Sequence, residues 1–358
     1  MEKKILKTLF EILAIDAPSG HEGELADLLV NKLVGLGFNT KKDKKGNVIG
    51  FLKGRGEPLL LTAHMDRVPP GKGHKPVRDG DIIKSDGSTN LGTDDAAGIS
   101  IILEAVKSII QENINHTSLV VLFTVEEEIG LAGARAADLS EFKVKRGIGY
   151  DNAFDAGVVV GSGSTYEGFD VEIIGKSMHP AKNLSKAINA IKIFQEIDWG
   201  IGESDSGKTR INVGVVNGGT ARNVIPGSVK VLGEMRTILG DDDVRERLKK
   251  LEENVKTVCD KYSAKYTFSI HRHSSSYKVN ENEPLLQVYK RVLEIRGAKL
   301  IMNPTFVGSD ANVFRAEKEM DVFTISTGVV GEHTVDEYIK ISDLVQLTED
   351  LVSILKTA

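Results

Sequence analysis

A block of three glutamates directly after a strongly apolar run constrains this chain more than any other feature. The stretch FTVEEEIGLAGA covers Phe123–Ala134, and the apolar run before the glutamates covers 119–123. Such a run is typical of a buried strand, so Glu126, Glu127 and Glu128 would stand together where that strand ends. Buried carboxylates repel one another and take up protons unless cations lie among them. The sequence therefore predicts that positive charge gathers at this point.

The composition is that of an ordinary globular protein large enough for two domains. Of its 358 residues, 41% are hydrophobic and 27% charged, and the net charge is −5. This charge gives no reason to expect nucleic acid or a membrane surface as a partner. The single cysteine excludes an intrachain disulfide and a cysteine-rich zinc site. No apolar segment is long enough to span a membrane, and 1–17 lacks a signal-peptide pattern, so we expect a cytoplasmic protein.

Strands and helices alternate in the first and last parts of the chain. Apolar spacing predicts strands over 47–52, 59–65, 118–125, 146–150 and 322–326, and helices over 3–15, 22–36, 130–139, 284–296 and 341–356. A further helix should begin at Asp94 or Asp95, because aspartate is a favoured N-cap residue and an apolar stripe follows it. This alternation implies a mixed, largely parallel sheet flanked by helices.

The middle of the chain follows a different order. Strands are expected over 168–175, 210–216, 228–237 and 265–273, with helices over 184–197 and 241–262. This β-α-β-β-α-β order is that of a ferredoxin-like sandwich. We therefore expect an α/β domain made of residues 1–167 and 279–358, with a ferredoxin-like α+β domain, residues 168–278, inserted into it.

Histidines and acids gather beyond the carboxyl ends of the predicted strands. They are His64, Asp66, Asp94, Asp95, the three glutamates, Asp151 and His333. Taken alone, each motif has a structural explanation, such as a helix cap or a solvated face. Together they lie on the edge where open α/β sheets bind ligands, and imidazoles with carboxylates suit a divalent metal such as zinc. So many acids favour a pair of ions about 3.5–4 Å apart over a single ion.

The same residues, taken in order, resemble the metallopeptidases of the M20 family, with peptidase T and its relatives as the nearest likeness. HMD at 64–66, GTDDAAG at 92–98, EEEIG at 126–130, Asp151 and EHT at 332–334 carry the resemblance. GKSMHPA and ARNVIPG extend it into the middle of the chain. The resemblance implies that the inserted domain is a lid and dimerisation domain, that the protein is a homodimer, and that each subunit binds two Zn²⁺, with Co²⁺ or Mn²⁺ as other possible ions.

The resemblance also implies a role for each matching residue. The metal ligands would be His64 and Asp151 on one ion, Glu128 and His333 on the other, and Asp94 between the two. Glu127 would be the general base, and the Asp66 carboxylate would accept the second ring N–H of His64. Glu126 would be a solvated or supporting acid. Substrate contacts would come from His179, Asn223, Arg236, Gly308 and Ser309, with His179 supplied by the partner subunit.

One loop departs from the peptidase T pattern. Phe306 and Val307 stand where true tripeptidases carry an arginine, which would clamp the terminal carboxylate of a peptide. Arg67, directly after HMD, is also atypical and could place a cation near the site, and Lys182 and Arg222 could bind anions instead. We therefore predict an aminopeptidase acting on short peptides. The alternative is an M20-type amidohydrolase or dipeptidase acting on N-acyl amino acids or dipeptides.

Other classes of protein fit less well. The EEEIGLAGA stretch also resembles the M42 aminopeptidases, but those insert a different domain earlier in the chain. A catalytically silent binding protein could have lost Glu127, yet this residue and all five expected ligands are present. A nucleotide-binding protein lacks support, because no phosphate-binding glycine motif follows a predicted strand.

Overall fold

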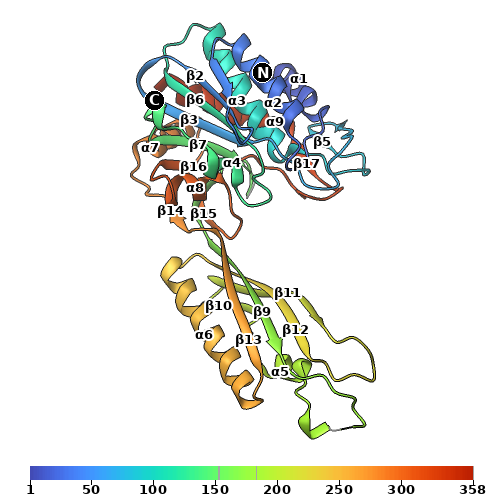
Figure 1. Ribbon diagram of the computed structural model, residues 1–358. Coiled ribbons are helices and arrows are strands. Elements are labelled where there is room, and N and C mark those ends of the chain that lie inside the picture. Colours follow the sequence, from blue (N-terminus) through green and yellow to red (C-terminus); the bar gives the residue numbers. More distant parts are fainter. Residues whose placement is uncertain (152–153, 183, 358) are drawn as a thin grey trace. The chain divides into compact units, whose positions relative to one another are not determined.

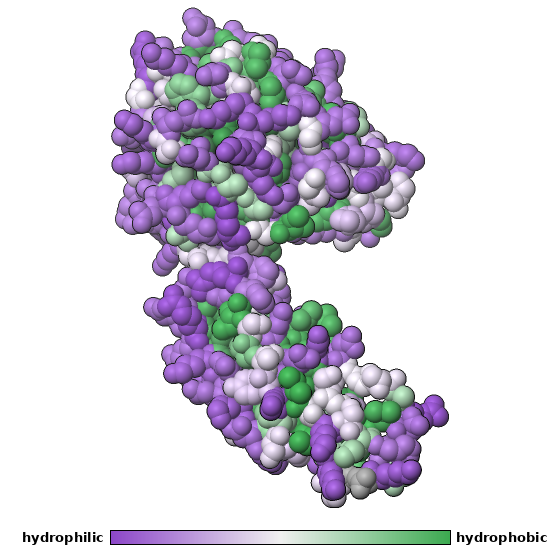
Figure 2. Space-filling model, viewed as in Figure 1, coloured by the Kyte–Doolittle hydropathy of each residue, from purple (hydrophilic) through white to green (hydrophobic). Residues whose placement is uncertain are grey.

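The computed structural model describes residues 1–151, 154–182 and 184–357, which form two compact units (Figure 1). The first unit combines Met1–Ser162 with Lys278–Ala358, and the second is Gly163–Tyr277. In the view of Figure 2, hydrophilic residues cover most of the surface of the first unit. None of the described helices is long and apolar enough to cross a membrane.

A nine-stranded sheet forms the centre of the first unit. Its order is β1 (Asn39–Lys42), β2 (Val48–Leu52), β6 (Thr117–Thr124), β3 (Arg55–His64), β7 (Arg146–Asp151), β16 (Asp321–Ser326), β8 (Val159–Gly163) and β14 (Tyr277–Lys278), with β15 (Met302–Thr305) paired to β8. The neighbours β6, β3, β7 and β16 run parallel, whereas β1, β2 and β8 pair antiparallel. Every residue of β6 is buried, as expected for a central parallel strand. The largely parallel sheet expected from the sequence is confirmed.

Helices pack around this sheet. They are α1 (Glu2–Leu13), α2 (Gly23–Gly35), α3 (Thr93–Gln111), α4 (Ala132–Ala136), α7 (Pro284–Ile295), α8 (Asp310–Ala316) and α9 (Ile341–Thr357), with a 3₁₀ turn at Ser140–Phe142. Helix α3 packs on α1 and α9 and also on strands β3 and β7. A small second sheet pairs β4 (Val77–Asp79) with β5 (Ile82–Lys84) and β5 with β17 (Tyr338–Lys340). This small sheet joins the segment between β3 and α3 to the region after His333.

The second unit is an antiparallel sheet with two helices. Its elements are β9 (Thr165–Ile174), a 3₁₀ turn at Leu184–Lys186, α5 (Ala190–Glu196), β10 (Gly202–Ser204), β11 (Thr209–Gly218), β12 (Ser228–Thr237), α6 (Asp241–Lys261) and β13 (Lys265–Ser274). The sheet order β10-β11-β12-β9-β13 keeps the ferredoxin-like arrangement, in which the first and third main strands are neighbours at the centre. The predicted ferredoxin-like fold is therefore confirmed, while the lid and dimerisation roles stay predictions.

Two predicted helices are shorter than the apolar spacing indicated. The segment 184–197 divides because Ile188 pairs with Lys176 as an isolated bridge, which takes its backbone groups out of a helix. The side chain of Asn189 then accepts hydrogen bonds from the N–H groups of Ile191 and Lys192 and starts α5. The expected helix over 130–139 is reduced to α4. The bridge to Lys176 thus keeps the first part of this apolar pattern out of the helix that Asn189 begins.

The core of the second unit offers a test of its packing. Phe169 is fully buried and its ring stacks with Trp199 and Phe268 at centroid distances of 6.4 and 6.2 Å. Phe169→Ala should lower the free energy of unfolding of this unit by about 3–5 kcal/mol, because it leaves a cavity among aromatic rings. Trp199 is the only tryptophan of the chain, so urea unfolding can be followed by its fluorescence.

The matched control for this substitution is Leu239→Ala, since the Leu239 side chain is 43% exposed. It should change the free energy of unfolding by no more than about 0.5 kcal/mol. Equal losses in the two variants would contradict the packing described for Phe169.

Candidate metal centre

The sheet brings the predicted ligands to its carboxyl edge, where their elements end or begin. His64 ends β3, Glu127 and Glu128 follow β6, Asp151 ends β7, Asp94 lies in the first turn of α3, and His333 lies in the turn after β16. Because β3, β6 and β7 are parallel neighbours, the residues that follow them lie side by side. Among the described residues, three groups of these side chains are close enough to hold a metal ion.

The first group consists of His64, Asp94 and Asp151. The Nε2 atom of His64 lies 3.3 Å from Asp94 Oδ1 and 3.9 Å from Asp151 Oδ1. His64 is 3% exposed, and its Nδ1 atom lies 3.0 Å from the carbonyl oxygen of Asp66. With Nδ1–H donating to that carbonyl, Nε2 carries the lone pair that a metal needs.

The second group consists of Asp94, Glu128 and His333. The Nε2 atom of His333 lies 3.3 Å from Asp94 Oδ2 and 2.9 Å from Glu128 Oε1. Asp94 therefore turns Oδ1 toward His64 and Oδ2 toward His333. One carboxylate is shared by two imidazole-and-carboxylate groups, which is the arrangement that a ligand bridging two ions requires.

The spacing within each group fits a tetrahedral ion. Ligand atoms about 2.0–2.2 Å from a zinc ion at tetrahedral angles lie roughly 3.3–3.6 Å apart. The distances from imidazole Nε2 to carboxylate oxygen in the two groups are 3.3 and 3.9 Å around His64 and 3.3 and 2.9 Å around His333, close to these values. Neutral imidazole and carboxylate donors are also the ligand types that zinc accepts. The residues present therefore fit divalent ions.

The chain turns sharply after β6, and this turn places two adjacent glutamates at one site. Glu126 has a left-handed φ of 50°, and the N–H groups of Gly130 and Leu131 bond to the Glu127 carbonyl. Glu126 itself lies apart and forms an ion pair with Lys45 at 2.6 Å, in keeping with a solvated or supporting role. Glu127 and Glu128 both come within ligand distance of His64.

Asp66 holds this turn and also lies beside His64. Its carboxylate accepts the N–H groups of Glu127 and Glu128, at 2.9 and 3.2 Å, and the hydroxyl of Ser19 at 2.7 Å. The Nδ1 atom of His64 lies 3.6 Å from the Asp66 carboxylate and 3.0 Å from the Asp66 carbonyl oxygen. That the carboxylate fixes the ring of His64 therefore stays a prediction.

Hydrogen bonds and burial shift the pKa values of the side chains in this cluster. Hydrogen bonds that the His333 ring donates to the carboxylates of Asp94 and Glu128 raise the pKa of His333 to about 10. Although burial alone would raise the pKa of Asp94, its hydrogen bonds with His333 and His64 lower it. Burial raises the pKa of Glu127 well above its usual value, and the charge of Asp151 adds to this effect. Burial thus favours protonated Glu127, and ion pairing favours protonated His333, as expected for carboxylates gathered in a buried place.

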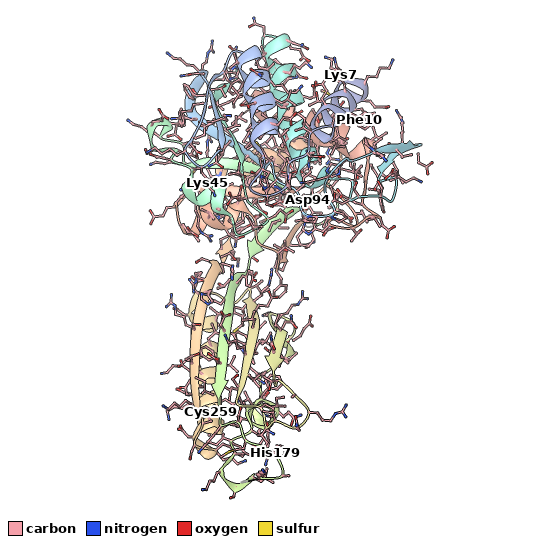
Figure 3. All side chains as sticks on the ribbon, turned by 45° about the vertical axis from the view of Figure 1, so that its right-hand side comes forward. Lys7, Phe10, Lys45, Asp94, His179 and Cys259 are labelled. Atoms are coloured by element: carbon pink, nitrogen blue, oxygen red, sulfur yellow. The ribbon has the colours of Figure 1, made fainter. Side chains whose placement is uncertain are left out.

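The residues expected to contact substrate are divided between the two units. His179, Asn223 and Arg236 belong to the second unit, whereas Asp94 belongs to the first; Figure 3 labels His179 and Asp94. His179 and Asn223 are exposed, whereas the Arg236 guanidinium lies 4.0 Å from the centre of the Tyr166 ring and bonds to Glu234. Lys182 and Arg222 are exposed on loops of the same unit.

In the first unit, Gly308 and Ser309 lead into α8, and Ser309 forms a capping box with Asn312. The cap gives Ser309 a structural role that does not depend on substrate.

Further acids support the cluster. Asp95, expected in the sequence as one of the gathered acids and as a possible helix cap, is buried, and its carboxylate accepts the N–H groups of His64 and Gly98. The roles of two others were not foreseen. Asp310 follows Ser309, bonds to the Thr124 hydroxyl at 2.6 Å, and has a pKa raised by burial to about 6. Glu337, four residues after His333, binds the loop that carries Asp94. The only signal for these residues was an acid next to a predicted ligand, and sequence spacing does not show where its side chain points.

Comparison with known proteins assigns the family. Residues 60–357 match peptidase family M20/M25/M40. The chain belongs to this family. YqjE of Bacillus subtilis, described as an uncharacterized protein, is 30% identical over all of this chain and 99% of its own length.

Two solved structures of peptidases are similar over almost the whole chain. Aminopeptidase PepT of Bacillus cereus has a TM-score of 0.92 and 27% identity, covering 99% of this chain and 98% of its own. A tripeptidase of Staphylococcus aureus has a TM-score of 0.95 and 26% identity with the same coverage. The chain is therefore an M20 peptidase of the peptidase T-like kind.

The raised pKa of His333 leads to a test of metal uptake. Below its ordinary pKa of 6.5 the protonated imidazole stabilises the metal-free fold, and this contribution is lost as the pH rises through about 10. Zn²⁺ added to metal-free protein near neutral pH must displace that proton, so uptake should release about one proton from each ligand imidazole. Indicator-dye titration in weak buffer measures the release.

The affinity for Zn²⁺ should also rise with pH as far as about 10. His333→Ala should release fewer protons and bind less metal than the wild type. Proton release equal to that of the wild type would contradict the role of His333 as a protonated ligand.

Proposed function

We propose that this chain is a two-metal aminopeptidase acting on short peptides, with Glu127 as its general base. The observation that carries the proposal is the shared carboxylate of Asp94, whose two oxygens face His64 and His333 separately. The similarity to an aminopeptidase and a tripeptidase over 99% of the chain supports the same reaction class. Zn²⁺ is the expected ion, with Co²⁺ or Mn²⁺ as alternatives.

The described side chains divide the work. His64 and Asp151 would hold one ion, Glu128 and His333 the other, and Asp94 would contact both. Two dications against these three carboxylates would leave about one positive charge, which would favour an anionic nucleophile at this site. When bound, such ions polarise a peptide carbonyl and lower the pKa of water to about 7.

In this proposal Glu127 would move the proton. It is 8% exposed and comes within ligand distance of His64 and Glu128, but it is outside the two groups that share Asp94. A buried carboxylate beside the ligands suits a group that accepts a proton from the attacking water and then gives it to the leaving nitrogen. Asp66 supports this step because its carboxylate accepts the N–H groups of both Glu127 and Glu128 and so fixes the backbone there.

A second reaction remains open because of one loop. Phe306 and Val307 precede α8 where an arginine would clamp the carboxylate of a tripeptide, and Val307 is 55% exposed. An apolar loop here favours substrates that lack a carboxylate at that distance, such as dipeptides or N-acyl amino acids. The alternative proposal is therefore an amidohydrolase or dipeptidase that uses the same metal ligands.

Replacing the general base tests the mechanism directly. Glu127→Gln keeps the size of the side chain but cannot take up the proton, so hydrolysis should fall by about 10²–10⁴-fold. Both metal ions should remain bound, because Glu127 is not needed in either group that shares Asp94. Steady-state kinetics and elemental analysis of the purified variant measure the two effects.

Glu126→Gln is the matched control. It removes a carboxylate from the adjacent residue, where Lys45 is its partner, and should leave kcat within a few-fold of the wild type. A Glu127→Gln enzyme with wild-type kcat would remove this residue from the reaction.

The two substrate classes are separated by a paired panel. We expect tripeptides with a free amino terminus to lose their first residue, and the same peptides after acetylation to resist cleavage. Mass spectrometry of the products identifies the bond broken. Cleavage of N-acetyl amino acids without cleavage of tripeptides would favour the amidohydrolase and exclude the aminopeptidase.

A further inference from the structure

The carboxylate of Glu337 collects most of the hydrogen-bond donors at the start of α3. It accepts the N–H groups of Leu91, Gly92 and Thr93 at 2.8, 3.0 and 2.7 Å, and the Thr93 hydroxyl at 2.6 Å. The N–H of Asp94 lies slightly farther away, at 3.4 Å. Glu337 is 1% exposed and up to 246 residues distant from these partners in the sequence. A buried carboxylate with four close donors is held rigidly, and it holds its donors in turn.

The turn that leads into α3 needs this carboxylate because its own residues offer no acceptor to these N–H groups. Gly92 has no side chain and a left-handed φ of 75°, and an added Cβ would lie 2.8 Å from the side chain of Arg67. The regular part of α3 begins later, after the non-helical Asp94 and Asp95, and there the Asp95 carboxylate accepts the N–H of Gly98 as a cap. Glu337 therefore serves the turn before that cap, the turn that carries Asp94.

The same short turn carries Glu337 and the metal ligand His333. Val330 and Tyr338 exchange two backbone hydrogen bonds of 2.9 Å, which close a turn with both residues inside it. The Glu337 carbonyl accepts the N–H of Ser85 at 3.0 Å, so the base of the turn is fixed to the small sheet as well. His333 near its tip then meets Asp94 Oδ2 at 3.3 Å.

Arg67 supplies the opposite charge for this arrangement. Its side chain is 1% exposed and donates to the carbonyl oxygens of Ile15 and Ile12 at 2.8 and 3.2 Å. It also packs against Gly92 and interacts electrostatically with Glu337. Arg67 therefore packs against Gly92, in the loop before Asp94, and its charge offsets the buried charge of Glu337.

We propose that Glu337 is a positioning residue for the ion held by Asp94, Glu128 and His333. It ties the turn of His333 to the loop of Asp94, so it sets the separation of these two ligands. The other ion depends less on Glu337, because His64 and Asp151 are placed by strands β3 and β7. The inference rests on the proposed two-metal function and extends it to a residue outside the ligand set.

Glu337→Gln tests the proposal with little change of size. An amide would turn an NH₂ group toward backbone N–H donors, so at least one of these contacts must break. We name the ion held by Asp94, Glu128 and His333 the second ion and the one held by His64 and Asp151 the first ion. The affinity of metal-free protein for the second Co²⁺ or Zn²⁺ should fall by about 10–100-fold, with the first ion changed less than about threefold. Calorimetric titration gives both constants, and the visible spectrum of Co²⁺ reports the geometry of each step.

Two controls make the result specific. Asp336→Asn removes an exposed carboxylate from the adjacent residue of the same turn and should leave both constants unchanged. His333→Ala removes a ligand of the second ion, so the Glu337→Gln titration should move toward the His333→Ala titration. Amide hydrogen exchange of metal-free protein should quicken at 91–94 in Glu337→Gln and not in Asp336→Asn. This last measurement involves no metal and still reports on a variant of reduced stability.

The outcomes separate this inference from the proposed function. A wild-type protein that takes up fewer than two ions would overturn the two-metal function itself. A wild type that binds two ions, together with a Glu337→Gln variant that binds both as tightly, would overturn the role of Glu337 alone. An equal loss at both sites, or unchanged exchange at 91–94, would likewise show that Glu337 does not position this ligand pair.

Discussion

The shared carboxylate of Asp94 is the interaction on which the rest of the site depends. It stands at the start of a buried helix, and its two oxygens face imidazoles from opposite ends of the sequence. A buried carboxylate in this position is stabilised by positive charge on both sides, and its hydrogen bonds with the two imidazoles lower the pKa of Asp94. The parallel strands β3, β6 and β7 then supply the other ligands, since their carboxyl ends share one edge.

This dependence explains why so much of the site could be predicted from the sequence. Buried runs such as 119–123 indicate parallel strands, and parallel strands bring the residues after them together. His64, Asp151 and the glutamates could therefore be grouped without knowing the order of the strands. The ferredoxin-like order was predictable for a similar reason, because apolar alternation identifies each long strand separately.

Contacts that depend on the direction of one side chain could not be predicted. The Asp66 carboxylate lies beside His64 and also accepts an N–H group of the glutamate turn, a contact that the spacing of HMD does not show. The break at Ile188 depends on a bridge to Lys176, which periodicity does not record. Glu337 lies 244 residues from Thr93, and the small sheet of β4, β5 and β17 joins the segment before α3 to the segment that carries Glu337. Long-range pairing of short strands leaves little trace in local sequence.

The placement of the ligands also bears on how substrate choice could vary. All five expected metal ligands and Glu127 belong to the first unit, whereas three of the five expected substrate contacts belong to the second. Groups that bind metal and move protons act on any amide carbonyl, so they cannot distinguish a free amino terminus from an acylated one. That distinction must come from residues such as those at 306–309 or in the second unit. Substitution there can change the substrate while Asp94 and its partners keep the same chemistry.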